Sequence, residues 1–145
     1  MKIKVTRKIE FDAAHRVIGH ENKCKYLHGH RYVLEVSFVT SKDTSRLDSL
    51  GRVIDFGVIK DRALTWVNDN LDHTTILSTA DKELGDFLEN YTGQKIYYLN
   101  SNPTAENIAV HLLKEILPEL FKDLYVKISG LKLYETPNCC TKVKD

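Results

Sequence analysis

The stretch CKYLHGHRYVLEVSFVT, residues 24–40, combines a cysteine and two histidines with a long alternating segment. Alternation of apolar and polar side chains is typical of a strand with one buried face. Tyr32, Leu34, Val36 and Phe38 share one parity of this segment, and Glu35 and Ser37 share the other. His28 and His30 have the same parity, so we expect both on one side of the strand, at the rim of its buried face.

A second alternating segment precedes this one, at residues 2–12, and helical and extended segments follow it. Helices are predicted at about 56–70, with Asp55 as N-cap, at 82–91, and within 102–120, where Asn102 and Pro103 are expected to begin the helix. Further strands are predicted at 95–99, 124–136 and 138–145, with a bulge near Ser129 and Gly130. This order favours a single α+β domain over residues 1–145, with helices on one face of an antiparallel sheet.

Charge and composition exclude several partners. The chain has 21 basic and 20 acidic residues without a long run of either sign, so neither nucleic acid nor an anionic membrane is an expected partner. No segment has the length and apolarity of a signal peptide or membrane span, which predicts a soluble cytoplasmic protein. Three cysteines, two of them the adjacent Cys139 and Cys140, do not indicate a disulfide framework.

Three of the six histidines are candidates for a metal site. If the first two strands are neighbours, His15 approaches His28 and His30, and three imidazoles can hold a tetrahedral zinc ion with one position open for water or substrate. An alternative is a closed structural site in which Cys24 is the fourth ligand. His20 is expected to be an ordinary surface or hydrogen-bonded histidine, as is His111.

Two further groups could support chemistry. Asp72 directly precedes His73, and a carboxylate beside a histidine can fix its tautomer and raise its basicity. If His73 reaches Cys24, the pair would provide a base or nucleophile. Glu135 has the inward parity of its strand, where it is either solvated at the strand end or placed to accept two parallel hydrogen bonds from a guanidine-like ring edge.

With these residues assembled, the sequence resembles the 6-pyruvoyl-tetrahydropterin synthase family over essentially its whole length. The resemblance rests on six motifs in the family's order: FDAAHR (11–16), CKYLHGH (24–30), RVIDFGVIK (52–60), LDHTTI (71–76), NPTAEN (102–107) and LYET (133–136).

The resemblance implies a role for each candidate residue. His15, His28 and His30 would hold zinc, and Cys24 would act as the base. Asp72 and His73 would tune the base and exchange protons with the substrate. Glu135 would anchor the pterin, with Thr104 as a weaker candidate contact. Arg16, Lys23 and Lys25 are candidates for binding a triphosphate.

The resemblance also implies a fold and an assembly. The family has the tunnelling fold, in which a four-stranded antiparallel sheet with two main helices on one face assembles into an oligomeric barrel. A homohexamer of two stacked trimers is the expectation, with active sites between subunits. Residues 81–100 depart from this pattern, because the segment looks longer than in compact members of the family.

The spacing within CKYLHGH indicates which reaction to expect. A gap of three residues between Cys24 and His28 resembles the pattern of one branch of the family. The enzymes of that branch are zinc-dependent lyases of queuosine biosynthesis that make 6-carboxytetrahydropterin. That reaction converts 7,8-dihydroneopterin triphosphate and releases acetaldehyde and triphosphate. The alternatives are elimination of triphosphate to give 6-pyruvoyl-tetrahydropterin, without carbon–carbon cleavage, and a non-catalytic zinc-stabilised binding module.

Overall fold

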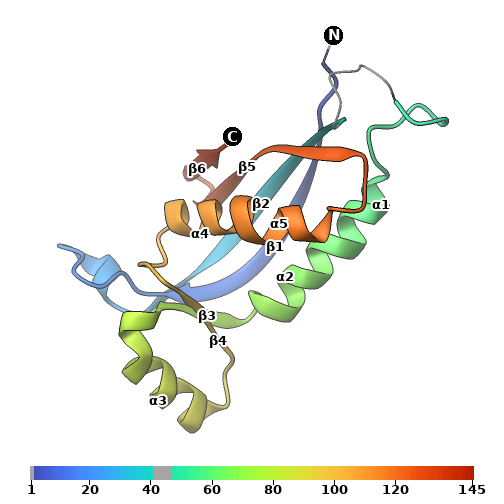
Figure 1. Cartoon of the computed structure of the whole chain (residues 1–145). Helices are drawn as coiled ribbons and strands as arrows, with labels where there is room; N and C mark the ends of the chain where they lie inside the picture. The colour runs from blue at the N-terminus through green and yellow to red at the C-terminus, as the bar shows by residue number, and fades with distance from the viewer. Residues whose placement is uncertain (1, 41–46) are drawn as a thin grey trace.

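A six-stranded mixed sheet forms the centre of the computed structural model, which describes residues 2–40 and 47–145 (Figure 1). The strand order is β4-β3-β1-β2-β5-β6. The strands are β1 Val5–His15, β2 His28–Thr40, β3 Thr74–Ser78, β4 Ile96–Leu99, β5 Val126–Thr136 and β6 Cys139–Val143.

The expected antiparallel sheet is present but is only part of the whole. β1, β2, β5 and β6 are antiparallel neighbours, whereas β3 pairs with β1, and β4 with β3, in parallel. The prediction of a four-stranded antiparallel sheet is therefore corrected to a mixed sheet of six strands. The bulge in β5 is confirmed, because the register against β2 shifts there and Gly130 has a φ of 150°.

β3 was not predicted from the sequence, and its environment explains why. All five of its residues are buried, so its sequence, TTILS, has no alternation between apolar and polar side chains. A short parallel strand that is covered on both faces lacks the period-2 signal. The long segment after β3 supplies α3 (Lys82–Thr92) and β4, and β3 and β4 together widen the sheet beyond its four antiparallel strands.

Two long helical segments flank the sheet. The first comprises α1 (Phe56–Ile59), a π-helical turn and α2 (Thr65–Asn70), and it begins as predicted, with the Asp55 side chain accepting a hydrogen bond from the amide of Gly57. The second comprises α4 (Ala105–His111), a further π-helical turn and α5 (Leu117–Leu120).

The predicted start of the second segment was two residues too early. Thr104, not Asn102, is the N-cap of α4, and its hydroxyl accepts a hydrogen bond from the amide of Asn107. Asn102 instead exchanges hydrogen bonds with the backbone of Ile18. Both residues are good capping types, so only the tertiary contact separates them.

The core lies between the sheet and both helical segments, which pack on the same face of β1 and β2 (Figure 1). Odd residues of β1 and even residues of β2 provide the strand side of this core, as their alternation predicts. The same parity continues to the last residue of β1 and to the first residue of β2. At this end of the strand pair, the three histidines lie on the core face.

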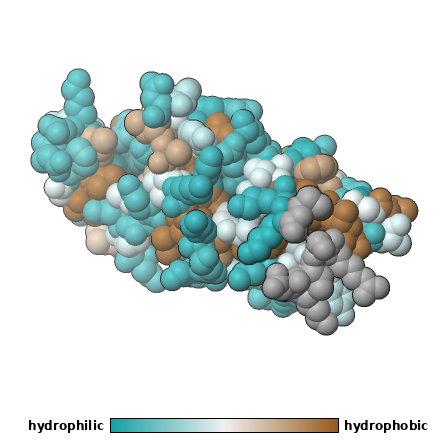
Figure 2. Space-filling view, turned by 90° about the horizontal axis from the view of Figure 1, so that it is seen from above, coloured by the Kyte–Doolittle hydropathy of each residue, from teal (hydrophilic) through white to brown (hydrophobic). Residues whose placement is uncertain are grey.

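Hydrophobic residues on the surface seen from above form separate patches among hydrophilic ones (Figure 2). None of the helices in the described ranges, 2–40 and 47–145, has both the length and the apolarity that crossing a membrane requires.

Candidate metal centre and active site

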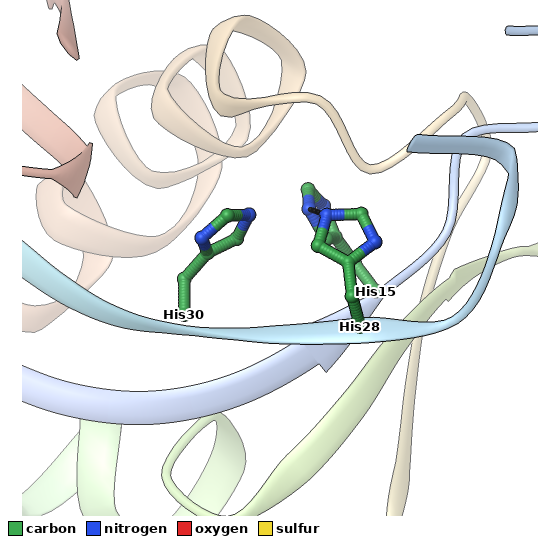
Figure 3. A group of neighbouring side chains, drawn as sticks. All are labelled: His15, His28 and His30. Atoms are coloured by element: carbon green, nitrogen blue, oxygen red, sulfur yellow. Dashed lines mark hydrogen bonds between the residues drawn. The ribbon is translucent and has the colours of Figure 1, made fainter. Parts of the chain in front are cut away.

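Three histidines meet at one end of the β1–β2 pair. His15 is the last residue of β1 and lies opposite His28, the first residue of β2, while His30 lies opposite Ala13. One nitrogen from each ring lies within 4.8 Å of the others, and Figure 3 shows the three rings on the same side of the sheet. The antiparallel register therefore brings the predicted three together.

Backbone carbonyl groups fix the tautomers of two of these rings. His15 Nδ1 lies 2.6 Å from the carbonyl oxygen of Pro103, and His28 Nδ1 lies 2.7 Å from that of Tyr26. Because a carbonyl oxygen only accepts hydrogen bonds, both Nδ1 atoms carry the proton and donate. The Nε2 atoms of the two neutral rings then present lone pairs to each other.

Those two Nε2 atoms are 3.1 Å apart (Figure 3). Two lone pairs at this distance repel each other unless a proton or a metal cation lies between them. The pKa of His15 is lowered to about 4, chiefly by burial; the hydrogen bond to Pro103 opposes this shift, and the charges of His28 and His30 add to it. At neutral pH the proton is therefore disfavoured, and the donor set fits a metal cation.

Cys24 lies outside this group of ligand atoms within the described residues. It is the middle residue of a 3₁₀ turn, Lys23–Lys25, and its carbonyl accepts a hydrogen bond from the amide of Val17. The geometry thus favours a site of three histidines with an open position over the closed alternative with Cys24 as fourth ligand.

Glu135 faces the histidines from β5. Its Oε1 atom is 3.8 Å from His15 Nε2, and its side chain is 28% exposed. Burial lowers the pKa of His30, while the charge of Glu135 acts in the opposite direction. The inward parity predicted for Glu135 therefore places a carboxylate beside the three imidazoles, at the edge of the same site.

Asp72 and His73 form the expected pair, but on the other face of the sheet. Asp72 Oδ2 is 2.8 Å from His73 Nδ1, and its Oδ1 accepts a hydrogen bond from the amide of Asp12. Burial alone would raise the pKa of Asp72, but the Asp12 amide, His73 and the charge of Arg31 together lower it. Asp12 and Arg31 lie opposite each other in the register, with side chains on the face away from the histidine site. Within one chain, the pair is therefore separated from the three histidines.

Arg16, a candidate triphosphate ligand, is engaged elsewhere. Its guanidinium makes two hydrogen bonds to Asp81, whose side chain is only 6% exposed. The hydrogen bond to Asp81 raises the pKa of Arg16. This ion pair joins the end of β1 to the turn that begins α3.

We expect substitution of Arg16 by glutamine to destabilise the fold, because it leaves the Asp81 carboxylate buried without its cation. Arg16 is 36% exposed, so water offsets part of the loss and we expect about 2 kcal/mol of unfolding free energy. Urea denaturation measures this value. Lys122→Gln, which removes the exposed ion pair with Glu119, is the control and should change little; equal effects of the two substitutions would contradict the structural role.

Some groups of the site give no side-chain signal in the sequence. The carbonyls of Pro103 and Tyr26 orient two histidines, and every residue has such a carbonyl. The ring of Tyr32, predicted as a core residue, also packs edge-on against His15 and His30. Thr104 caps α4, directly after Pro103.

The fold and the site together define an α+β protein with three histidines placed to hold a metal ion. The family described as 6-pyruvoyl tetrahydropterin synthase matches residues 4–145. The chain belongs to this family.

Curated relatives cover nearly the whole chain. Proteins named 6-carboxy-5,6,7,8-tetrahydropterin synthase from Rickettsia felis and Rickettsia bellii are 60% and 58% identical over 141 residues, 97% of this chain and 99% of each relative. The protein of that name from Aquifex aeolicus is 32% identical and covers 100% of this chain and 99% of its own length.

Solved structures show the same fold. An uncharacterised protein of Wolinella succinogenes superposes with a TM-score of 0.81 at 22% identity and covers 100% of this chain and 99% of its own. A Plasmodium vivax 6-pyruvoyltetrahydropterin synthase superposes with a TM-score of 0.71 at 16% identity and covers 100% and 98%. The six-stranded arrangement is therefore a form of the family's architecture.

Proposed function

We propose that this protein is a 6-carboxy-5,6,7,8-tetrahydropterin synthase. It converts 7,8-dihydroneopterin triphosphate to 6-carboxytetrahydropterin, with release of acetaldehyde and triphosphate and consumption of one water. The observation that carries the proposal is the full-length identity of 58–60% to relatives of that name. The product is an intermediate of queuosine biosynthesis, and the enzyme acts in the cytoplasm.

The three histidines are the proposed zinc ligands. Neutral imidazoles are favoured ligands of zinc, and a set of three leaves the fourth position for substrate, as in catalytic sites. When bound there, zinc acts as a Lewis acid toward the side-chain oxygens of the substrate and supports a lyase reaction. His15 and His28 are held for this task by the carbonyls of Pro103 and Tyr26, which keep both Nε2 atoms unprotonated.

Glu135 is the proposed pterin anchor. Its carboxylate offers two oxygens to the two N–H groups of the guanidine-like pyrimidine edge, a geometry that favours paired, charge-assisted hydrogen bonds. Its position beside the histidines lets one molecule place its ring on Glu135 and its side chain over the metal position. Thr104 is a secondary candidate for contact with the ring.

Cys24 is the proposed base that removes a carbon-bound proton from the substrate side chain. His73, oriented by Asp72, exchanges protons with the side-chain oxygens. The His73 side chain is 77% exposed, which leaves it accessible to a substrate held by another subunit.

The separation of these groups supports an assembly with active sites between subunits. Asp72 and His73 lie on the face opposite the metal ligands, so a second copy must supply them to a given substrate. β4 and β6 end the sheet, and exposed strand edges are commonly paired or covered. We propose a homohexamer of two stacked trimers whose sheets form a barrel.

Product analysis tests the reaction. We expect the purified protein with zinc and 7,8-dihydroneopterin triphosphate to form acetaldehyde, triphosphate and 6-carboxytetrahydropterin in equal amounts. Chromatography of the pterins and derivatisation of the aldehyde measure these products. Accumulation of 6-pyruvoyl-tetrahydropterin without acetaldehyde would instead assign the pyruvoyl reaction, and no turnover with zinc retained would favour a binding module.

A further inference from the structure

The hydroxyl of Tyr32 is an unexplained polar group next to the site. Tyr32 is 0% exposed, and its Oη atom has no hydrogen-bond partner among residues 2–40 and 47–145. Buried hydroxyl groups are nearly always paired, because an unpaired one loses its hydrogen bonds to water without replacement. Because this unpaired hydroxyl lies beside a site that can receive a ligand, we expect it to gain a hydrogen-bond partner when the ligand binds.

The ring of Tyr32 forms part of the wall of the site. It stacks on Phe11 with centroids 5.0 Å apart and planes inclined by 12°. The rings of His15 and His30 meet it edge-on, at centroid distances of 6.0 and 5.6 Å. These contacts hold the ring in place between the core and the metal ligands, so its hydroxyl has a defined position.

Glu135 is the carboxylate that follows the β2–β5 ladder at this end. The pairing of β2 with β5 ends at Val33 and Tyr134, and Tyr32 and Glu135 are the next residues of the two strands, both on the parity of the core face. The Tyr32 O–H is thus a donor close to a carboxylate with which it makes no hydrogen bond in this structure.

We propose that Tyr32 is a positioning residue for the pterin anchor, donating its O–H to the Glu135 carboxylate when the pterin binds. The inference rests on the proposed role of Glu135. It explains the orphan hydroxyl, because in this structure the Glu135 carboxylate lies toward His15 and makes no hydrogen bond with Tyr32. Each carboxylate oxygen accepts more than one hydrogen bond, so the phenol and the pterin edge can be bound together.

The proposed hydrogen bond would keep the Glu135 carboxylate from turning toward the metal position. Glu135 Oε1 is 3.8 Å from the His15 Nε2 atom that faces the ligand group, so a cation held there attracts the carboxylate. As a fourth ligand, Glu135 would block the open position and turn away from the pterin. A donor in the wall beside it keeps the carboxylate directed at the ring edge.

The test is Tyr32→Phe, which removes only the hydroxyl. Its probe is pterin without a side chain, which presents the anchored edge but cannot react, titrated by fluorescence into zinc-loaded protein. We expect Tyr32→Phe to weaken pterin binding by about tenfold, the loss of one hydrogen bond to a charged group. Zinc affinity and the melting temperature of metal-free protein should not fall, since the hydroxyl has no partner to lose.

Tyr98→Phe is the matched control. The Tyr98 hydroxyl is also buried without a partner among the described residues, but it lies against Gly85 of α3. Its removal should leave pterin binding unchanged. Glu135→Gln should weaken binding by more than Tyr32→Phe, and the double variant should bind no more weakly than Glu135→Gln alone.

Three results would overturn the inference. The first is a Tyr32→Phe variant that binds pterin as tightly as the wild-type protein. The second is a double variant whose loss of pterin affinity is the product of the two single losses. The third is a Tyr32→Phe variant that also loses zinc affinity and melting temperature, which would mark a structural role. Failure of the wild-type protein to bind pterin would overturn the proposed anchor, and this inference with it. Wild-type binding that is insensitive to Tyr32→Phe would overturn this inference alone.

Discussion

Replacing His28 by alanine is expected to abolish turnover and to reduce bound zinc from one ion per chain to a small fraction. His28 is one of the three proposed ligands, and its Nε2 is the atom that lies 3.1 Å from His15 Nε2. Two remaining imidazoles do not fill a zinc coordination sphere. In the proposed reaction a metal Lewis acid would contribute several kcal/mol to the transition state, so its loss corresponds to about a thousandfold or more in rate.

His20→Ala is the matched control, because His20 lies in the same β1–β2 connection but outside the ligand group of the described residues. It should keep full zinc content and full activity. Metal analysis after gel filtration, with activity measured on the same samples, checks both variants. Full zinc occupancy in His28→Ala would contradict the assignment of the ligands.

Cys24→Ala is expected to lower turnover by about 10² to 10⁴ and to retain zinc, because loss of a general base has this size of effect. Cys24 lies outside the described group of ligand atoms, so its thiol should contribute nothing to zinc affinity. The melting temperature of the zinc-loaded variant should match that of the wild-type protein.

Cys140→Ala, which removes an exposed thiol from β6, provides the comparison for Cys24→Ala and should behave as wild type. A Cys24→Ala variant that loses zinc and unfolds would identify the closed structural site. One that keeps zinc and full activity would assign the base to another group.

Local patterns predicted the antiparallel part of the sheet and the meeting of three histidines at its end. Strict alternation in β1 and β2 placed His15, His28 and His30 on the core parity, and the antiparallel register then brought them together. Glu135 followed from the same rule in β5. Each of these inferences needed only a period of two and the pairing of neighbouring strands.

Features that depend on tertiary context were missed. β3 is buried on both faces and has no alternation, and α4 begins at Thr104 because Asn102 is drawn to the backbone of Ile18. The carbonyls that orient two of the histidines have no side-chain signature. The position of Asp72 and His73 on the opposite face required knowledge of how β3 joins β1.

X-ray absorption spectroscopy of the zinc-loaded protein tests the central claim, an open metal centre of three histidines, most directly. We predict a first shell of three imidazole nitrogens at about 2.0–2.1 Å with one further oxygen, and no sulfur. The same spectrum should be obtained from Cys24→Ala. A sulfur shell at about 2.3 Å that disappears in Cys24→Ala would contradict it and identify a closed site with Cys24 as the fourth ligand.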